Sequence, residues 1–370
     1  MARAAILYFE FRDFPEGAVA AVEEALLQAV RSQRYILSEK VTAFEQEFAT
    51  ALGAAHAIGV GNGYDALLLA LKAIGAGPGD EVIVPANTFI ATANAVAQAG
   101  CVPVLVEPDA HTYNLTAATA AKAITARSKA ILPVHLYGQA CEMGALVELA
   151  TTQNLYLIED FAQAHGATYG GKAVGTFGNV NATSFYPTKN LGALGDAGAV
   201  VTNNATIAAF IRQYHNYGET AKYHNQLIGI NSRLDVLQAA VLQVKLAFLQ
   251  QATQERQRLA QLYLSELQEV GEVVLPFTAP GCSHVFHVFN IRSSHRDALR
   301  AHLLALGIHT AIHYPVPVHL QPAYSYLGYR PGDFPVAEEL AATSLSLPLF
   351  PGLREDEQLA IIEAVKKYFR

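Results

Sequence analysis

The sequence predicts an α/β protein whose main sheet is largely parallel and lies between helices. Over the first two-thirds of the 370 residues, short apolar runs alternate with helical patterns, which is typical of a parallel sheet with crossover helices on both faces. The hydrophobic content of 52% also exceeds what one small core needs, which favours two lobes. No internal repeat or low-complexity segment interrupts this pattern.

Start and stop signals delimit the expected elements. A strand and turn within residues 54–63 lead into a helix at 64–77, which ends in the glycines typical of a helix C-terminus. The next strand stops at Pro85, and residues 88–98 can form a helix. Further apolar runs predict strands within residues 102–109, 129–138, 155–166, 181–186 and 198–203.

The C-terminal third predicts a second, smaller α+β unit. A helix from about Leu234 to Leu267 is long enough to cross between lobes, at about 1.5 Å per residue. A boundary near its middle gives a large domain at 1–250 and a small domain at 251–370. Beyond it, the pattern predicts a strand at 284–292, a helix at 296–307, a strand at 309–314 and a closing helix at 354–369.

Composition and charge oppose several classes of protein. The net charge of −7 and pI near 6.0 oppose a nucleic-acid surface, so small molecules are the expected partners. The N-terminal apolar run is soon interrupted by Glu10 and Arg12, and no later run reaches membrane length. We therefore expect a cytoplasmic protein without a membrane span. The three cysteines are far apart, which opposes a disulfide framework or a metal site.

Polar residues that follow the apolar runs are candidates for a site, because ligands of open α/β folds bind beyond the carboxyl ends of the strands. In "GNGYDA", Gly63 and Tyr64 open a helix whose free N–H groups would bind a phosphate. A plain strand-to-helix turn is the alternative. The glycines do not fit G-x-G-x-x-G and no ribose-binding acid follows, which opposes a nicotinamide dehydrogenase.

Two adjacent carboxylates, Glu159 and Asp160, follow a strand apolar enough to be buried. A buried carboxylate is costly unless a cation pairs with it. The partner is either an arginine or helix N-terminus, the commoner case, or a protonated heterocycle. Gln163 and His165 follow closely and could line the same pocket, although a histidine there is more often structural.

A single lysine, Lys189, lies in a loop just beyond the strand that carries Ser184. It precedes the glycines of its loop, so the stretch is not a Walker motif. Loop lysines are usually solvated, but one desolvated here would have a lowered pKa and could form a Schiff base. Phe89, in "ANTF", could lie over a planar ring or fill core space.

Together these residues match the needs of one cofactor, pyridoxal 5′-phosphate. It needs a phosphate site, an aromatic platform, an amine for its aldehyde and a carboxylate that keeps its pyridine nitrogen protonated. A scaffold role would leave Asp160 and Lys189 unexplained. A non-catalytic regulator that binds the cofactor would need a DNA-reading module, which no segment offers.

Longer stretches closely resemble the DegT/DnrJ/EryC1/StrS family of sugar aminotransferases. The resemblance covers nearly the whole chain, in family order. Its motifs are "SQRYILSEKVTAFEQEFA", "PANTFIATANAV", "PVHLYGQ", "IEDFAQAHGA", "SFYPTKNLGALGDAGAVVTN", "GINSRLDVLQAAVLQVKL" and "IHYPVPVHLQPAY". It implies a PLP-dependent aspartate-aminotransferase-like fold, known as fold type I.

The resemblance implies a role for each matched residue. Lys189 becomes the Schiff-base lysine and proton shuttle, and Asp160 the partner of the pyridine nitrogen. Gln163 would lie near the phenolic oxygen, and Phe89 would stack on the ring. The implied phosphate contacts are Gly63, Tyr64, Ser184 and, from the other subunit of a homodimer with shared active sites, Asn231. The implied sugar-nucleotide contacts are Tyr35, Tyr186, His313 and Tyr314.

The implied reaction moves an amino group from L-glutamate, which leaves as 2-oxoglutarate, to a nucleotide-linked ketosugar. Relatives that remove a sugar hydroxyl carry histidine in place of Lys189, so a dehydrase is disfavoured. The lysine loop, "NYGETAKYH" and "NSRLD" are more similar to enzymes that act at C3 of dTDP-3-keto-6-deoxyhexoses than to the C4 branch. Amination at C4 and a UDP-linked 3-keto sugar are the alternatives.

Two residues depart from the family pattern. Tyr64 stands where threonine or serine is usual, so the phosphate contact there can be made by the backbone only. His309 replaces a common glycine and places a titratable ring close to the expected substrate segment. It either alters the choice of sugar or faces solvent.

Overall fold

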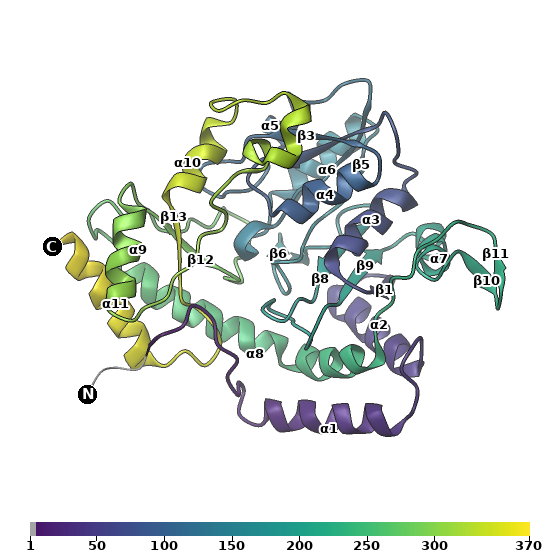
Figure 1. Cartoon of the computed structure of the whole chain (residues 1–370), viewed down its shortest axis with the longest axis horizontal. Coiled ribbons are helices and arrows are strands. Elements are labelled where there is room, and N and C mark those ends of the chain that lie inside the picture. The colour runs from purple at the N-terminus through teal and green to yellow at the C-terminus, as the bar shows by residue number, and fades with distance from the viewer. Residues whose placement is uncertain (1–4) are drawn as a thin grey trace.

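Helices and strands alternate along the first two-thirds of the chain, as predicted (Figure 1). The computed structural model describes residues 5–370. Its helices are α1 (Ala18–Arg31), α2 (Glu39–Leu52), α3 (Gly63–Ala73), α4 (Ile90–Gln98), α5 (Ala117–Ala121), α6 (Met143–Thr152), α7 (Ala205–Tyr214), α8 (Val236–Glu266), α9 (Arg296–Ala305), α10 (Pro335–Thr343) and α11 (Glu355–Phe369), with short 3-10 turns at Leu136–Gly138, Val318–Leu320 and Pro322–Leu327. Its strands are β1 (His56–Val60), β2 (Glu81–Pro85), β3 (Val102–Val106), β4 (Ser128–Ile131), β5 (Tyr156–Leu157), β6 (Thr168–Tyr169), β7 (Lys172–Ala173), β8 (Asn181–Ser184), β9 (Gly198–Thr202), β10 (Glu219–Ala221), β11 (His224–Asn225), β12 (Phe289–Arg292) and β13 (Ser344–Leu347).

The central sheet is mainly parallel, as the sequence predicts. Strands β3, β2, β4 and β5 pair in that order, and every pair is parallel. Just beyond β5, Asp160 forms parallel bridges with Val134 on one side and with Ala182 of β8 on the other. β9 then pairs antiparallel with both β8 and β1. The bridges of Asp160 therefore place this carboxylate where the two parts of the sheet meet.

Helices cover both faces of the sheet because its strands are apolar on both sides. In β2, Val82 and Val84 pack on α3, α4 and α7, whereas Ile83 lies between them in sequence and packs on the other side with α5 and α6. In β9, Val200 and Val201 divide in the same way, the latter facing α2 and α8. The predicted α/β class, with helices on both faces, is confirmed.

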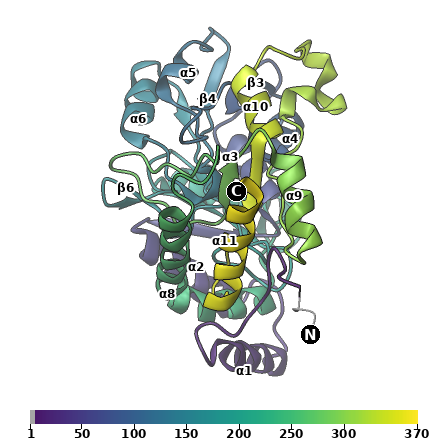
Figure 2. The same cartoon turned by 90° about the vertical axis from the view of Figure 1, so that its left-hand side faces the viewer.

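The long helix α8 extends from the sheet to the C-terminal part of the chain (Figure 1). There α11 packs against α8 and α9 (Figure 2). Acidic residues in the first turn of α11 and lysines in its last turn suit the helix dipole. Buried side chains of α8, α9 and α11 form one hydrophobic core at this end of the molecule. Ile6 belongs to this core, although it lies near the start of the chain.

Several elements differ from the prediction. Residues 309–314 do not form a strand: Ala311 makes only an isolated bridge with Ser346, so the segment lacks the continuous pairing that its apolar pattern suggested. The strand expected at 284–292 is formed only as β12, from Phe289 onward. Helix α4 starts at Ile90, two residues later than expected. The N-terminal helices α1 and α2 were not predicted.

Within the described residues, no helix is long and apolar enough to cross a membrane. No cluster of three or more histidine, cysteine or acidic side chains among these residues has a geometry that could hold a metal ion. Cys101, Cys141 and Cys282 are all free thiols.

Candidate active site

The carboxyl ends of β1, β2, β5 and β8 surround a cavity of about 370 Å³. Nine of the predicted site residues line it, namely Gly63, Tyr64, Phe89, Asp160, Gln163, Ser184, Tyr186, Lys189 and Tyr314. These residues come from segments up to 251 positions apart in sequence, from Gly63 to Tyr314. The sheet thus brings together the side chains that the strand-end rule singled out.

One end of the cavity is the N-terminus of α3. Asn62 caps this helix by accepting a hydrogen bond from Asp65 N at 2.8 Å, and the amides of Gly63 and Tyr64 open the first turn, where no helical acceptor precedes them. The backbone here lies against Ser184: a Cβ on Gly63 would be 2.4 Å from Ser184 Cβ. Only glycine allows this approach, and it leaves free N–H groups and a serine hydroxyl side by side, as an anion site requires.

The carboxylate of Asp160 is buried at the middle of the cavity. Its Oδ2 accepts a hydrogen bond of 2.9 Å from Thr92 Oγ1, and its Oδ1 accepts one of 3.2 Å from Ala162 N. Burial raises the pKa of Asp160, while these two hydrogen bonds and the nearby Lys189 oppose the rise. A carboxylate so oriented, with few partners of its own, fits the role of counter-ion to a protonated ring nitrogen.

Its neighbour Glu159 points the other way and is fully occupied. The two oxygens of Glu159 accept hydrogen bonds from the amides of Gly175, Phe177 and Gly178, at 2.8, 2.6 and 2.8 Å. His135 Nε2 lies 3.0 Å from the same carboxylate. Glu159 therefore holds the 175–178 turn in place, and only Asp160 faces the cavity.

The loop that carries Lys189 is held in place on several sides. Lys189 N donates a hydrogen bond of 2.8 Å to Tyr186 O, and Lys245 Nζ donates one of 2.8 Å to Gly192 O. A Cβ on Gly192 would be only 2.2 Å from Pro187 O, so this turn needs glycine. The loop is therefore fixed by contacts rather than being free in solvent.

The amine of Lys189 is set apart from an ordinary surface lysine. Burial lowers its pKa to about 8, against the attraction of Asp160. Burial likewise lowers the pKa of His165 to about 3 and that of His313 to about 4, and Lys189 contributes to both shifts. These imidazoles are neutral at pH 7, so Lys189 is the cation of the group. An amine that loses its proton near pH 8 can react with an aldehyde under mild conditions.

Aromatic and amide groups close another side of the cavity. Phe89 is half-exposed to it, with its ring centroid 5.3 Å from that of Tyr314. Gln163 is buried, accepts a hydrogen bond of 2.6 Å from Tyr137 N and donates one of 3.1 Å to Tyr314 Oη. These contacts fix the Gln163 amide at the cavity wall and leave the face of Phe89 available to a planar ring.

Three predicted site residues do not line this cavity. His313 is adjacent to it through Tyr314, and its Nδ1 lies 2.8 Å from Ser346 Oγ. Tyr35 is exposed and donates a hydrogen bond of 3.0 Å to Val30 O, and Asn231 is also exposed. His309, one of the two departures from the family pattern, is exposed as well and does not line this cavity.

Sequence reasoning did not single out Thr92 or Asn62. Thr92 lies in the first turn of α4, three residues after Phe89, and its role depends on Asp160, which is 68 positions away. The signal for Asn62 was present, because an asparagine before a helical run is a common N-cap.

These residues fit pyridoxal 5′-phosphate. The α3 N-terminus and Ser184 would hold its phosphate, Phe89 its ring face, Asp160 its ring nitrogen and Lys189 its aldehyde carbon. The close approach at Gly63 and the buried, sparsely bonded carboxylate of Asp160 are the two observations that an ordinary strand-to-helix turn does not explain.

A family model described as the DegT/DnrJ/EryC1/StrS aminotransferase family matches residues 18–366. The chain belongs to this family. The resemblance stated from the motifs is thereby confirmed, and so is the predicted class of enzyme, a sugar aminotransferase. The DegT/DnrJ/EryC1/StrS family depends on pyridoxal 5′-phosphate, as predicted.

Curated relatives are similar to the chain over most of their length. A dTDP-3-amino-3,4,6-trideoxy-alpha-D-glucose transaminase of Streptomyces venezuelae is 47% identical, over 94% of this chain and 92% of the relative. A UDP-N-acetyl-3-dehydro-alpha-D-glucosamine 3-aminotransferase of Acidithiobacillus ferrooxidans is 46% identical, over 90% and 89%. A Geobacillus stearothermophilus protein named pleiotropic regulatory protein is 45% identical, over 94% of both.

Solved structures agree with the fold. A crystal structure of DesV from S. venezuelae, in complex with a ketimine intermediate, superposes with a TM-score of 0.97 at 45% identity and covers 100% of this chain and 99% of that one. The fold-type-I prediction is confirmed by this similarity. Together the findings support sugar aminotransferase activity on nucleotide-linked sugars.

Proposed function

We propose that the protein transfers the amino group of L-glutamate to C3 of a dTDP-linked 3-keto-6-deoxyhexose. The observation that carries this proposal is the presence of Lys189 and Asp160 in one cavity with the free N-terminus of α3. When bound, pyridoxal 5′-phosphate supplies an electron sink for the charge that develops at the reacting carbon. The amino acids around it decide which proton moves and which substrate is held.

Lys189 is the residue that moves the proton. Its Nζ would hold the cofactor through the aldehyde carbon and would also be the group that accepts and gives the proton moved in the transfer. A pKa of about 8 allows the amine both to accept and to give that proton near neutral pH. Asp160 would keep a positive charge on the ring nitrogen of the bound cofactor, because a buried carboxylate favours a cation beside it.

The sugar is expected at the open side of the cavity. Tyr186 is 52% exposed there, and Tyr314 lies beside Phe89. Two kinds of support favour C3: the motifs around Lys189, and relatives whose names specify amination at C3 of a dTDP-linked or UDP-linked sugar. Amination at C4 and a UDP-linked 3-keto sugar are the alternatives to be tested.

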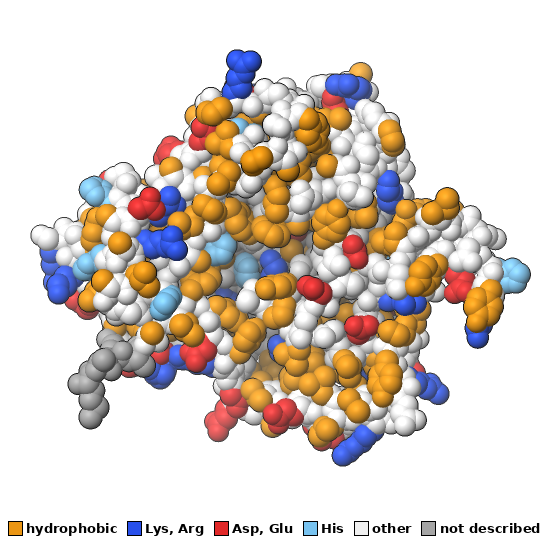
Figure 3. Space-filling view, viewed as in Figure 1, with side chains coloured by type: hydrophobic (Ala, Val, Ile, Leu, Met, Phe, Trp, Pro, Cys, Tyr) orange, Lys and Arg blue, Asp and Glu red, His pale blue; other side chains and the backbone are white. Residues whose placement is uncertain are grey.

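The proposal includes a homodimer in which Asn231 of one chain reaches the cofactor phosphate of the other. Asn231 is exposed and outside the cavity of its own chain, as such a role requires. Hydrophobic side chains gather on the lower part of the face seen in Figure 3, which carries α1. The exposed large hydrophobic residues within residues 18–37 are Val19, Leu27, Val30, Tyr35, Ile36 and Leu37. A second copy of the chain would cover such a surface.

The proposal also includes a large domain at residues 1–250 and a small domain at residues 251–370, with the boundary inside α8.

Two measurements test the proposed function. The purified protein should be yellow, and L-glutamate should bleach the absorption band. After this treatment with L-glutamate, the protein should aminate one member of a panel of dTDP-linked and UDP-linked 3-keto and 4-keto sugars. The aminated sugar is detected by mass spectrometry. Lys189→Ala is the control and should give no aminated product while remaining folded. Amination of 4-keto sugars alone would refute C3, and a colourless protein that gains no band with added cofactor would refute the class of enzyme.

A further inference from the structure

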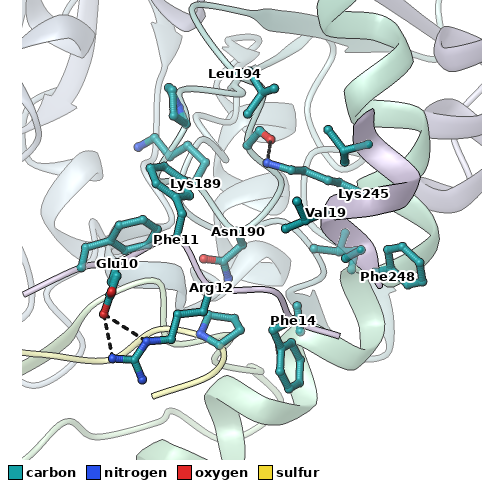
Figure 4. Close-up of a pocket in the computed structure, with 18 of the residues that line it drawn as sticks. Glu10, Phe11, Arg12, Phe14, Val19, Lys189, Asn190, Leu194, Lys245 and Phe248 are labelled. Atoms are coloured by element: carbon teal, nitrogen blue, oxygen red, sulfur yellow. Dashed lines mark hydrogen bonds and ion pairs between the residues drawn. The ribbon is translucent and has the colours of Figure 1, made fainter. Parts of the chain in front are cut away.

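Lys189 also lines a second cavity of about 370 Å³, which lies between the N-terminal segment, the lysine loop and α8 (Figure 4). Most of its wall is apolar and includes Phe9, Phe11, Phe14, Val22, Phe248 and Leu249. Four cationic side chains line it, namely Arg12, Lys189, Lys245 and Arg256. A charge buried in such apolar surroundings is costly unless an opposite charge or hydrogen-bonding groups pair with it. A cation without such a partner in the chain therefore indicates that the cavity can bind an anion.

Three of these cations have partners within the chain. Arg12 is neutralised by two carboxylates, with contacts of 2.6 Å to Glu357 and 2.7 Å to Glu10. Lys245 is half-buried and donates to Gly192 O, as Figure 4 shows. Lys189 is attracted to Asp160 and belongs to the cofactor site.

Arg256 lacks a carboxylate partner among the described residues. Its side chain is buried, with 3% of the residue exposed, yet no ion pair involves it. One nitrogen, Nη1, donates hydrogen bonds of 3.2 Å to Phe286 O and 3.1 Å to Leu349 O. Nε and Nη2 make no hydrogen bond to the described part of the chain. Burial lowers the pKa of Arg256 to about 10, against a smaller opposing contribution from Tyr8.

The proposed reaction calls for a cation in addition to Lys189, and the described residues of one chain that line the cofactor cavity do not include it. L-Glutamate carries two carboxylates, and Lys189 is the only lysine, arginine or histidine among the described residues that line the cofactor cavity. Lys189 is occupied by the cofactor and by proton transfer. A planar guanidinium with two free donors in an apolar wall is well suited to a carboxylate, because the charge-assisted pair is strengthened where water is excluded.

Resting on the proposed function, we propose that Arg256 binds a carboxylate of the amino-acid donor, in the cavity that it shares with Lys189. The donor then enters from the side of the N-terminal segment and α8, whereas the sugar nucleotide uses the opening beside Tyr186. Arg256 thereby selects dicarboxylic amino acids. A phosphate of the nucleotide is the competing anion, and the test below separates the two.

The test measures binding of glutarate, a dicarboxylate without an amino group, to the cofactor-loaded protein by titration calorimetry. Glutarate should bind the wild-type protein, and Arg256→Gln should weaken this binding about tenfold or more, because a charge-assisted pair is lost. In the absence of sugar, the concentration of L-glutamate that half-bleaches the absorption band should rise by a similar factor. Because no sugar is present, a failure of C3 specificity would not affect either readout.

Arg258→Gln is the matched control, since Arg258 lies on the same helix α8 but is exposed, pairs with Glu255 and lines neither of the two cavities. It should leave glutarate binding unchanged. Arg256→Lys keeps the charge and should restore part of the binding, which also covers the case in which Arg256→Gln does not fold. If folded, cofactor-loaded Arg256 variants bind glutarate like the wild type, the proposal is overturned. It is also overturned if they lose dTDP binding and keep glutarate binding.

Discussion

Asp160 Oδ2 accepts a hydrogen bond of 2.9 Å from Thr92 Oγ1, and this contact joins the first turn of α4 to the point where the two parts of the sheet meet. Thr92 Oγ1 is itself 2.9 Å from Thr88 Oγ1. The carboxylate is thus oriented by a short relay of hydroxyls whose members are almost fully buried. Contacts within the protein therefore orient the Asp160 side chain without a cofactor. Substitution of Thr92 tests how much cofactor binding depends on this orientation.

Replacing Thr92 with valine should weaken retention of the cofactor. The substitution keeps the shape of the side chain but removes the donor, so the pKa of Asp160 rises further and its charged form is less available to the ring nitrogen. A hydrogen bond to a charged group contributes about 1.5–3 kcal/mol and about 1.4 kcal/mol is tenfold, so the dissociation constant of pyridoxal 5′-phosphate should rise roughly tenfold or more. Absorbance titration of the apoprotein measures it. Thr92→Ser is the control and should bind like the wild type; equal affinity in Thr92→Val would show that Asp160 does not depend on this hydroxyl.

Capture of the cofactor by the apoprotein should depend on pH through Lys189. Only the neutral amine reacts with an aldehyde, and the pKa of Lys189 is about 8. The neutral fraction, and with it the rate, should therefore rise about tenfold from pH 6 to pH 7 and level off above pH 8. Rapid-mixing absorbance gives this profile. Because Asp160 favours the charged amine, Asp160→Asn should move the midpoint to lower pH. A midpoint near 10.5, the ordinary value, would contradict the burial of this amine.

The close approach between α3 and β8 predicts a selective cost for a methyl group at Gly63. Gly63→Ala would place Cβ 2.4 Å from Ser184 Cβ and 3.0 Å from Ser184 Cα, so backbone must move. Overpacking of this kind costs about 1–3 kcal/mol, and the melting temperature of the apoprotein should fall. Gly77→Ala is the matched control, because nothing lies within 4 Å of the added atom and the backbone there is not left-handed. Equal melting temperatures for the two variants would mean that the α3–β8 contact tolerates displacement.

The ends of the parallel strands could be predicted because each strand is visible in the sequence as an apolar run that stops at a proline or at polar residues. The sequence placed the end of β2 at Pro85 and identified both acids at 159 and 160. Alternation along a strand implies that Glu159 and Asp160 point to opposite sides, but which one faces the ligand depends on distant atoms. The amides that donate hydrogen bonds to the Glu159 carboxylate belong to Gly175, Phe177 and Gly178, and no sequence pattern near Glu159 indicates these contacts.

Other features depend on three-dimensional contacts in the same way. Residues 309–314 have an extended, apolar pattern, but the only sheet-like partner of Ala311 is Ser346, so no strand forms. Arg256 is one of several polar residues on α8, and its burial becomes evident only when Phe286 and Leu349 are seen to cover it. Tertiary packing, rather than local propensity, decides both the absence of a strand at residues 309–314 and the burial of Arg256.

Shared active sites in the proposed homodimer predict that two inactive variants complement each other. Lys189→Ala removes the amine from its own site, whereas Asn231→Asp would place a negative charge beside the phosphate of the partner's site. In a mixed dimer one site carries both defects and the other carries neither. Random reassociation of equal amounts should therefore recover roughly a quarter of the wild-type activity, given an isologous two-fold dimer. The aminated sugar, quantified by mass spectrometry after co-refolding, measures the recovery. Each variant co-refolded with itself is the control and should stay inactive. Asn231 belongs to its own chain's site instead if the mixture is as inactive as its components, because every site would then contain one defect.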